Sequence, residues 1–348
     1  MKSQIHEFQN FKIIIMSKKS LFILMFLAFQ IAKAQVNLSN ISIGKSSFMK
    51  YEADSVSLNE TNEFTEMEKK FTHGNLRIYM LRANDKYVTA NRDIGNYTSL
   101  QEAIKGKKIK ISELDGGTVN TLEFENTSRD TIMILAGEVV TGGKQDRVVG
   151  QDLILPPNKG KVKVAVFCVE HHRWSPQGSG YQFTGHQGIT SGKVRHGAVV
   201  DKSQGKVWEE VADVNKKNKT ETSTGTYVAI QNSETLKTEL PKYVSHFEKL
   251  MMADSNYIGF VAVTGDTIIS ADLFATNQMF KKQAPQLLKS VAVEAITNGT
   301  VVAIAAIKVM DFLNEFLKDE TKQEEKVNEN GTMLKNNGKK LHLNYYKK

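Results

Sequence analysis

The chain has 348 residues, 40% of them hydrophobic, which is enough to bury a large core and excludes a globally disordered protein. Its formal net charge of +8 is spread over that whole length, which argues against nucleic-acid binding. The single cysteine, Cys168, excludes an internal disulfide, so the core alone must stabilise the fold.

The first 34 residues resemble an export signal. A short basic start at residues 16–19 precedes nine apolar residues, 21–29, and the sequence Ala-Lys-Ala at 32–34 fits a cleavage site. Nine apolar residues are too few to cross a bilayer, which takes roughly 20. We therefore expect translation to start at Met16, the mature chain to begin at Gln35, and the protein to be periplasmic or extracellular.

Export would change the charge balance and the expected membrane contact. Residues 1–34 hold five lysines and one glutamate, so the mature chain would carry 41 basic and 37 acidic side chains, or +4. No lipidation motif follows the signal, which predicts a protein without a stable membrane anchor.

Strand patterns dominate the first half of the mature chain. Residues 35–70 are polar and predict a loosely packed arm, and strands then follow one another from Leu76 to Val169 with one short helix at residues 99–104. This order favours an antiparallel sheet over alternating strands and helices. We expect an α+β protein with a β-sandwich or barrel-like core over about residues 71–174.

The second half predicts helices that pack on this core. They are expected at residues 205–218, 242–252, 278–297 and 301–317, with a hairpin at 257–271. Residues 175–200 contain six glycines and predict a long loop that covers the site. We expect one domain over residues 71–317 and a charged tail at 318–348, in which residues 341–346 can add an edge strand.

Two glutamates lie where a fold would not require a charge. Glu138 follows an apolar run and a glycine, and Glu170 ends the buried face of a strand at residues 161–169. A buried carboxylate needs a partner, and Arg173 is near enough in sequence to supply one. Glu170 is therefore either half of a structural ion pair or a carboxylate of a site, and both glutamates are candidate catalytic bases.

The segment between these glutamates is rich in hydrogen-bond donors. Two glycines precede Lys144, Gln145 and Arg147, so this segment either binds a phosphate or carboxylate or forms a charged hairpin turn. Trp174 either stacks on a ligand ring or fills the core. Asp272, after the hairpin, either caps a turn or adds a third carboxylate near Glu138.

A metal site is the weaker interpretation of the same region. Six potential ligands fall within 29 residues, but their spacing fits no zinc pattern: Cys168, Glu170, His171, His172, His186 and His196. Cys168 lies among valines, where cysteine usually packs and does not react. We expect neither a metal nor a cofactor.

The ordered set of motifs resembles a known family, the ARPP domain, named for its association with ADP-ribosylglycohydrolases and rhodanese-phosphatase-superfamily proteins. The motifs are residues 135–138 (LAGE), 142–147 (GGKQDR), 168–174 (CVEHHRW), 207–208 (VW) and 272–274 (DLF), and the resemblance covers about residues 71–317. It implies a link to NAD-derived or ADP-ribose-like nucleotides. The positions that match the polar pattern of the family are Glu138, Lys144, Gln145, Arg147, Glu170, Arg173 and Trp174.

Two hypotheses follow. In the first, the polar residues bind a small anionic or nucleotide-like ligand and hydrolyse it, with Glu138 or Glu170 as the base and with Arg147 and Arg173 neutralising negative charge. In the second, the protein is a non-catalytic exported binding or interaction module. Convergence of these four charges on an open pocket favours the first, and pairing along a closed surface favours the second.

Overall fold

The computed structural model describes residues 40–43, 49–52, 55–58, 62–114, 118–175 and 181–347. The predicted export signal, the start at Met16 and the cleavage before Gln35 lie outside these residues. No helix in the described part of the chain combines the length and the apolar character that a bilayer crossing requires.

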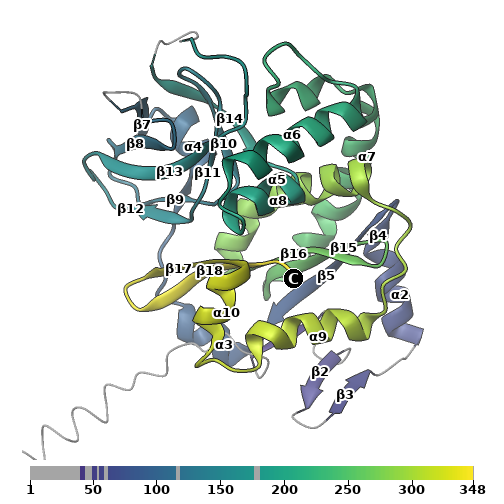
Figure 1. Ribbon diagram of the computed structural model, residues 1–348. Helices are drawn as coiled ribbons and strands as arrows, with labels where there is room; N and C mark the ends of the chain where they lie inside the picture. The colour runs from purple at the N-terminus through teal and green to yellow at the C-terminus, as the bar shows by residue number, and fades with distance from the viewer. Residues whose placement is uncertain are drawn as a thin grey trace, which may run out of the picture. The chain divides into compact units, whose positions relative to one another are not determined.

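A nine-stranded antiparallel sheet joins the two ends of the described chain (Figure 1). In order across the sheet its strands are β17 (Gly331–Asn336), β18 (Lys339–Tyr345), β16 (Thr267–Phe274), β15 (Tyr257–Thr264), β5 (Leu76–Ala83), β1 (Ile41–Ile43), β2 (Met49–Glu52) and β3 (Ser55–Leu58), and β4 (Thr72–His73) pairs with β5 outside this order. The predicted strand at residues 76–81 therefore pairs with strands from the second half of the chain.

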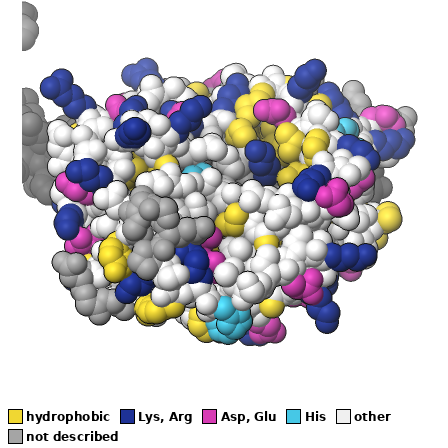
Figure 2. All heavy atoms as spheres, turned by 90° about the horizontal axis from the view of Figure 1, so that it is seen from above, with side chains coloured by type: hydrophobic (Ala, Val, Ile, Leu, Met, Phe, Trp, Pro, Cys, Tyr) yellow, Lys and Arg dark blue, Asp and Glu magenta, His cyan; other side chains and the backbone are white. Residues whose placement is uncertain are grey.

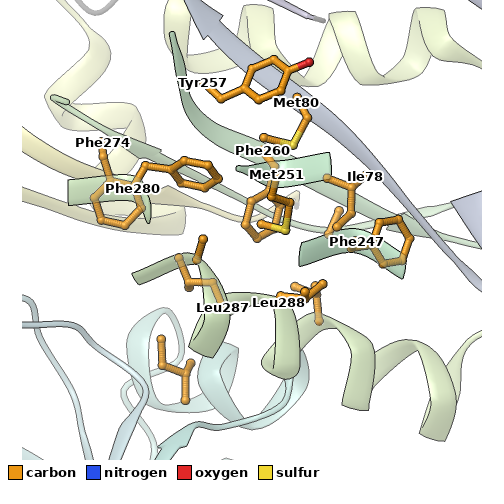
Figure 3. Packing of buried hydrophobic residues seen from close by; sticks show 14 of the residues in the cluster. Ile78, Met80, Phe247, Met251, Tyr257, Phe260, Phe274, Phe280, Leu287 and Leu288 are labelled. Atoms are coloured by element: carbon orange, nitrogen blue, oxygen red, sulfur yellow. The ribbon is translucent and has the colours of Figure 1, made fainter. Parts of the chain in front are cut away.

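Both faces of this sheet are covered, as the sequence of β5 shows. Ile78 and Met80 pack on one face against helix α8 (Asn277–Asn298) and helix α7 (Glu234–Met251), as Figure 3 shows. Tyr79 and Leu81 pack on the other face against helix α9 (Ala306–Leu317). Successive side chains of a strand point to opposite faces, so an almost uninterrupted apolar strand requires a helical layer on each side.

The second core is a half-barrel made of two smaller sheets. The six-stranded sheet has the order β14 (Phe183–Ile189), β10 (Glu138–Gly142), β11 (Arg147–Val149), β13 (Val162–Cys168), β8 (Thr121–Asn126) and β7 (Ile109–Glu113), and the three-stranded sheet has the order β12 (Leu153–Leu155), β9 (Ile132–Ile134) and β6 (Thr98–Ser99). Their side chains form one buried cluster around Phe124 and Val164. The predicted α+β class with a barrel-like antiparallel core is confirmed.

The remaining helical elements are α2 (Asn62–Lys70), α3 (Asp85–Asn91), α4 (Leu100–Lys105), α5 (Gly192–Val199), α6 (Gln204–Asn218), the 3₁₀ turn η1 (Tyr227–Asn232) and α10 (Gln323–Asn330). Among them, α4 and α6 lie close to their predicted positions, whereas the other five were not predicted. The capping box that predicted α4 is present, because the Ser99 and Glu102 side chains each accept a hydrogen bond from the backbone of the other. Helix α7 begins eight residues before its predicted start, where Ser233 caps it.

Two segments differ from the prediction. Residues 175–200 were expected to be a loop, but residues 183–189 form β14 and residues 192–199 form α5. The pairing of β14 with β10 contains two register shifts, and Gly185 lies so close to Thr141 that a Cβ atom would be 2.0 Å from its Oγ1. Gly185, one of the glycines that suggested a loop, is thus required by the close approach of an irregular strand pairing.

The segment after Lys318 also differs from the charged tail that its composition suggests. Residues 323–330 form α10, and β18 lies between β16 and β17, so that it is an inner strand and β17 is at the edge. Its alternating polar residues His342 and Asn344 are fully buried. The strand expected at residues 341–346 is thus present, but it is an inner strand and not the expected edge strand. Hydrophobic periodicity does not identify its neighbours, because they lie elsewhere in the chain.

Candidate functional site

Glu138 lies at the start of β10 and is fully buried. Its Oε2 accepts a hydrogen bond from the Leu135 amide at 2.7 Å, and its Oε1 lies 3.0 Å from Nε2 of His186. Gly137 permits this tight turn, since its φ is 95° and a Cβ atom there would lie 2.6 Å from Cγ of Arg195. Both carboxylate oxygens of Glu138 therefore have protein partners.

Arg147 follows the loop that ends β10 and is also fully buried. Its Nη1 donates to the Gln145 carbonyl at 2.7 Å, and its Nε donates to the Val119 carbonyl at 3.3 Å. Its Nη2 lies 3.8 Å from the Glu113 carboxylate and makes no hydrogen bond to a described residue. The guanidinium of Arg147 thus holds the loop together from inside.

Glu170 and Arg173 form the predicted ion pair just after β13. Arg173 Nη2 lies 2.6 Å from Glu170 Oε2, and Nε of the same arginine donates to this oxygen at 2.7 Å. Arg173 also donates to the Gly143 carbonyl at 2.8 Å and lies 3.3 Å from Asp146 Oδ1. Burial raises the pKa of Asp146, and the neighbouring Glu170 carboxylate adds to this shift.

Lys144 is the one charged side chain of this loop that faces an aromatic surface. Its Nζ lies 5.0 Å from the ring centre of Trp174 and 5.7 Å from that of Tyr181. Trp174 is 51% exposed and Tyr181 is 57% exposed. These distances allow cation–π attraction to both rings. The neighbouring Gln145 is buried, and its amide donates to the His171 carbonyl at 3.2 Å.

Asp272 belongs to a different, fully buried network. Its carboxylate lies 3.0 Å from Arg195 Nη1 and 3.2 Å from His342 Nε2, and His342 Nδ1 lies 2.7 Å from Asp152 Oδ2. Burial opposes ionisation of Asp272, but Arg195 and His342 outweigh it and hold the pKa of this carboxyl below its usual value. The network reaches the turn before Glu138, because Arg195 Nε donates to the Ala136 carbonyl at 2.9 Å.

The structure thus places the eight predicted site residues in three groups. The first group shares the loop after β10 and the end of β13 and consists of Lys144, Gln145, Arg147, Glu170, Arg173 and Trp174. Glu138 lies at the opposite end of β10, about 13 Å along the strand at roughly 3.3 Å per residue. Asp272 forms the third group, in the large sheet.

The motifs at residues 135–138, 142–147, 168–174 and 272–274 thus contain the residues that make these contacts, and a comparison with known families identifies the family to which they belong. The family whose sequence model matches the chain is ARPP-1, the ARG and Rhodanese-Phosphatase-superfamily-associated Protein domain, over residues 65–344. The chain belongs to this family. No curated protein and no solved structure matches it.

The matched span extends past the range in which the sequence resemblance was found. It begins in α2 and ends in β18, so the ARPP-1 domain includes α10 and the last two strands of the large sheet. This is consistent with the buried contacts of His342 and Asn344 with Asp272, since those contacts join the end of the domain to its centre.

Two of the cavities in the described part of this ARPP-1 domain are large enough for a small molecule. One of about 530 Å³ lies between β14, α7 and α8 and is lined by His186, and one of about 460 Å³ lies beside α5 and is lined by Tyr346. None of the eight predicted residues lines either cavity. In the described part of the chain no three His, Cys, Asp or Glu side chains are grouped as metal ligands would be.

Four polar residues of these contacts were missed as partners by the sequence analysis: Asp152, His186, Arg195 and His342. His186 was considered only as a metal ligand, and it contacts Glu138 across 48 residues of sequence. Asp152 and His342 are 190 residues apart. No local signal identifies such pairs, because strand neighbours are decided by the tertiary fold. Cys168 is buried, and burial raises the pKa of its thiol, as expected for a packed cysteine.

Proposed function

We propose that this protein binds a small nucleotide-like anion on the surface formed by Lys144, Trp174 and Tyr181, and that it does not hydrolyse this ligand. The observation that carries the proposal is the position of two exposed aromatic rings beside one ammonium group. Among the described residues, Trp174 and Tyr181 are the only aromatic side chains in the set of exposed large hydrophobic ones. Exposed aromatic rings that gather at one point are typical of a binding surface.

The chemistry of this Lys144 surface suits a planar ring that carries a phosphate. Stacking of a base on an aromatic side chain contributes about 1–3 kcal/mol, and an ammonium group attracts the phosphate. Lys144 Nζ forms no ion pair with any carboxylate of the described residues, so its charge is available. The association of the family with ADP-ribose-handling proteins agrees with a nucleotide-like ligand.

The positions of Glu138 and Glu170 do not favour hydrolysis of a ligand bound at the Lys144 surface. Glu170 Oε2 accepts hydrogen bonds from Arg173 Nε and from the Asp146 amide and forms an ion pair with Arg173 Nη2, and Glu138 is buried behind His186. A general base must reach a water molecule beside the ligand, and both carboxylates are buried and already have protein partners. The pairing of these charges favours the non-catalytic hypothesis.

The distribution of surface charge also favours a small ligand over nucleic acid. Figure 2 shows lysine, arginine and acidic side chains scattered over the visible face, without a continuous basic stripe. A nucleic-acid surface would need clustered basic residues.

Fluorescence of Trp174 tests the proposal directly. The chain has two tryptophans, so a Trp208→Phe variant leaves Trp174 as the single reporter. We expect AMP and ADP-ribose to quench its fluorescence in a saturable way, and ribose 5-phosphate to bind more weakly because it has no base to stack. Lys144→Gln should weaken binding about tenfold, which corresponds to about 1.4 kcal/mol.

The matched control is Lys163→Gln, which removes an exposed lysine from β13. This variant should bind AMP as the parent does. Absence of saturable quenching by both nucleotides, or equal loss of affinity in Lys144→Gln and Lys163→Gln, would show that the Lys144 surface is not a nucleotide site.

We also propose that the protein acts outside the cytoplasm, with a mature chain that begins at Gln35. The signal-like composition of residues 16–34 supports this proposal. Amino-terminal sequencing of the protein recovered from the producing cells tests it, and an uncleaved segment before Gln35 would contradict it.

A further inference from the structure

We propose a second binding site, distinct from the Lys144 surface, in the cavity of about 530 Å³ between β14, α7 and α8. We infer that it takes a small organic anion with an apolar body, such as an aliphatic carboxylate. The volume lies within the range of about 300–1,000 Å³ that is usual for small-molecule sites.

The charged groups in the wall of this cavity all have one sign. Lys237 from α7 and Lys289 from α8 line it, and no aspartate or glutamate does. The other cavity differs, because its wall contains Asp201, Glu210 and Glu294 besides lysines. A wall that carries only cations attracts an anion, whereas a wall of mixed charge has no such preference.

Both lysines can accept a new anionic partner. Lys289 is exposed and makes no hydrogen bond or ion pair with any residue that the structure describes. Lys237 pairs with Glu234 at 2.8 Å, but the two side chains are 52% and 86% exposed. Exposed ion pairs of neighbouring helical residues are weak, so a ligand anion can compete for Lys237.

His186 lines the cavity and contacts a buried carboxylate that does not line it. Its Nε2 contacts Glu138, which is fully buried and does not line the cavity. Its Nδ1 accepts a hydrogen bond from the Gly188 amide at 3.3 Å. Both ring nitrogens of His186 thus have protein partners, so the ring offers no free nitrogen to a ligand, and the site is suited to binding more than to proton transfer.

The wall also has an apolar part, beside its four glutamines. Leu240, Pro241 and Val244 follow one another on one face of α7, and Pro241 is exposed at this point. Ile189 and Val293 come from β14 and α8. An anionic head bound by the lysines would leave an apolar body against these side chains, which removes their surface from water.

The probe for this site is 8-anilinonaphthalene-1-sulfonate, an amphipathic organic anion whose fluorescence rises in apolar surroundings. It is titrated with the native full chain. We expect saturable binding, displacement of the dye by octanoate, and at least tenfold weaker displacement by octanol, which has the same apolar body without the charge. Octanoate should also raise the melting temperature of the protein, which separates binding to the folded state from binding to unfolded chains.

Variants assign the binding to this cavity. Lys289→Gln should weaken the binding of octanoate about fivefold or more. Lys193→Gln removes an exposed lysine from the wall of the other cavity and should leave the affinity for octanoate unchanged. AMP should not displace octanoate, so loss of nucleotide binding at the Lys144 surface would leave this result intact. Equal affinity for octanoate and octanol, or an equal effect of the two lysine substitutions, would overturn the proposal.

Discussion

The guanidinium group of Arg173 joins Glu170 to the loop after β10. It contacts the carboxylates of Glu170 and Asp146 and the carbonyl groups of Gly142 and Gly143. Only 11% of its side chain is exposed. At this degree of burial a charge is tolerated because it is paired and hydrogen-bonded, so the arrangement is sensitive to the removal of one partner.

We therefore expect Arg173→Ala to lower the free energy of unfolding by about 3–5 kcal/mol, since two buried carboxylates lose their cation. Arg173→Lys should lower the free energy of unfolding by less, because lysine keeps the positive charge although it lacks the planar fork of donors. Urea denaturation measures both values. The control is Arg129→Ala, at an exposed arginine, which should change the free energy by no more than about 0.5 kcal/mol. Equal stability of the two alanine variants would contradict a structural role for Arg173.

Strand β18 is the element that links the half-barrel to the large sheet. His342 lies between Asp152, which precedes β12, and Asp272 in β16, and its ring stacks on Phe274 with 4.4 Å between the ring centres. Burial alone would lower the pKa of His342, but the two carboxylates reverse this effect and the pKa is raised. The same contacts lower the pKa values of both aspartates.

The raised pKa of His342 and the lowered pKa values of the two aspartates predict how the stability of the fold depends on pH. A histidine whose pKa is higher in the folded state stabilises the fold fully below its unfolded pKa of about 6.5, and this stabilisation is lost as the pH rises through the folded pKa. The aspartates stabilise the fold above their unfolded values and lose this effect as the pH falls through their lowered folded values. The network therefore contributes most to the stability of the fold at a pH above the unfolded pKa values of the aspartates and below the unfolded pKa of the histidine.

We expect the free energy of unfolding to fall in the parent protein as the pH rises above about 6.5, and this fall to be smaller in His342→Gln. Urea denaturation at a series of pH values measures it. His172→Gln, at an exposed histidine, is the control and should keep the slope of the parent. An identical pH dependence in the parent and in His342→Gln would show that His342 does not gain a proton-linked stabilisation on folding.

At the scale of the whole molecule, helix α8 connects the two cores. Leu287 and Leu288 pack on the large sheet, as Figure 3 shows, while Val293 packs with α5, α6 and the half-barrel strands. The strands β5 and β15, which form the centre of the large sheet, are separated by more than 170 residues of sequence, so neither half of the chain can form this sheet alone.

We therefore expect residues 35–348 to unfold in one cooperative transition, because loss of either core exposes the apolar faces of α8. Trp174 and Trp208 lie in or beside the half-barrel, whereas circular dichroism reports on all helices and sheets. Urea transitions followed by tryptophan fluorescence and by circular dichroism should coincide. Two separate midpoints would mean that the large sheet and the half-barrel are independent folding units.

Local pattern alone was sufficient to predict several parts of this fold. The alternation of β13 identifies its buried face, the Thr264–Asp266 turn identifies the β15–β16 hairpin, and the apolar periodicity of α8 identifies the longest helix. The pairing of Glu170 with Arg173 was also accessible, because three residues separate them at a strand end. In each case the interacting groups are near in sequence, so their spacing carries the information.

Only the tertiary structure decided which distant groups meet. Glu138 contacts His186, and Asp272 contacts His342 and Arg195, across 48 to 77 residues of sequence. The sequence places Glu138 and Glu170 in one region, but β10 separates them, and the exposed rings of Trp174 and Tyr181 become neighbours through Lys144. The physical reason is that hydrophobic periodicity states which face of an element is buried and leaves open which element covers it.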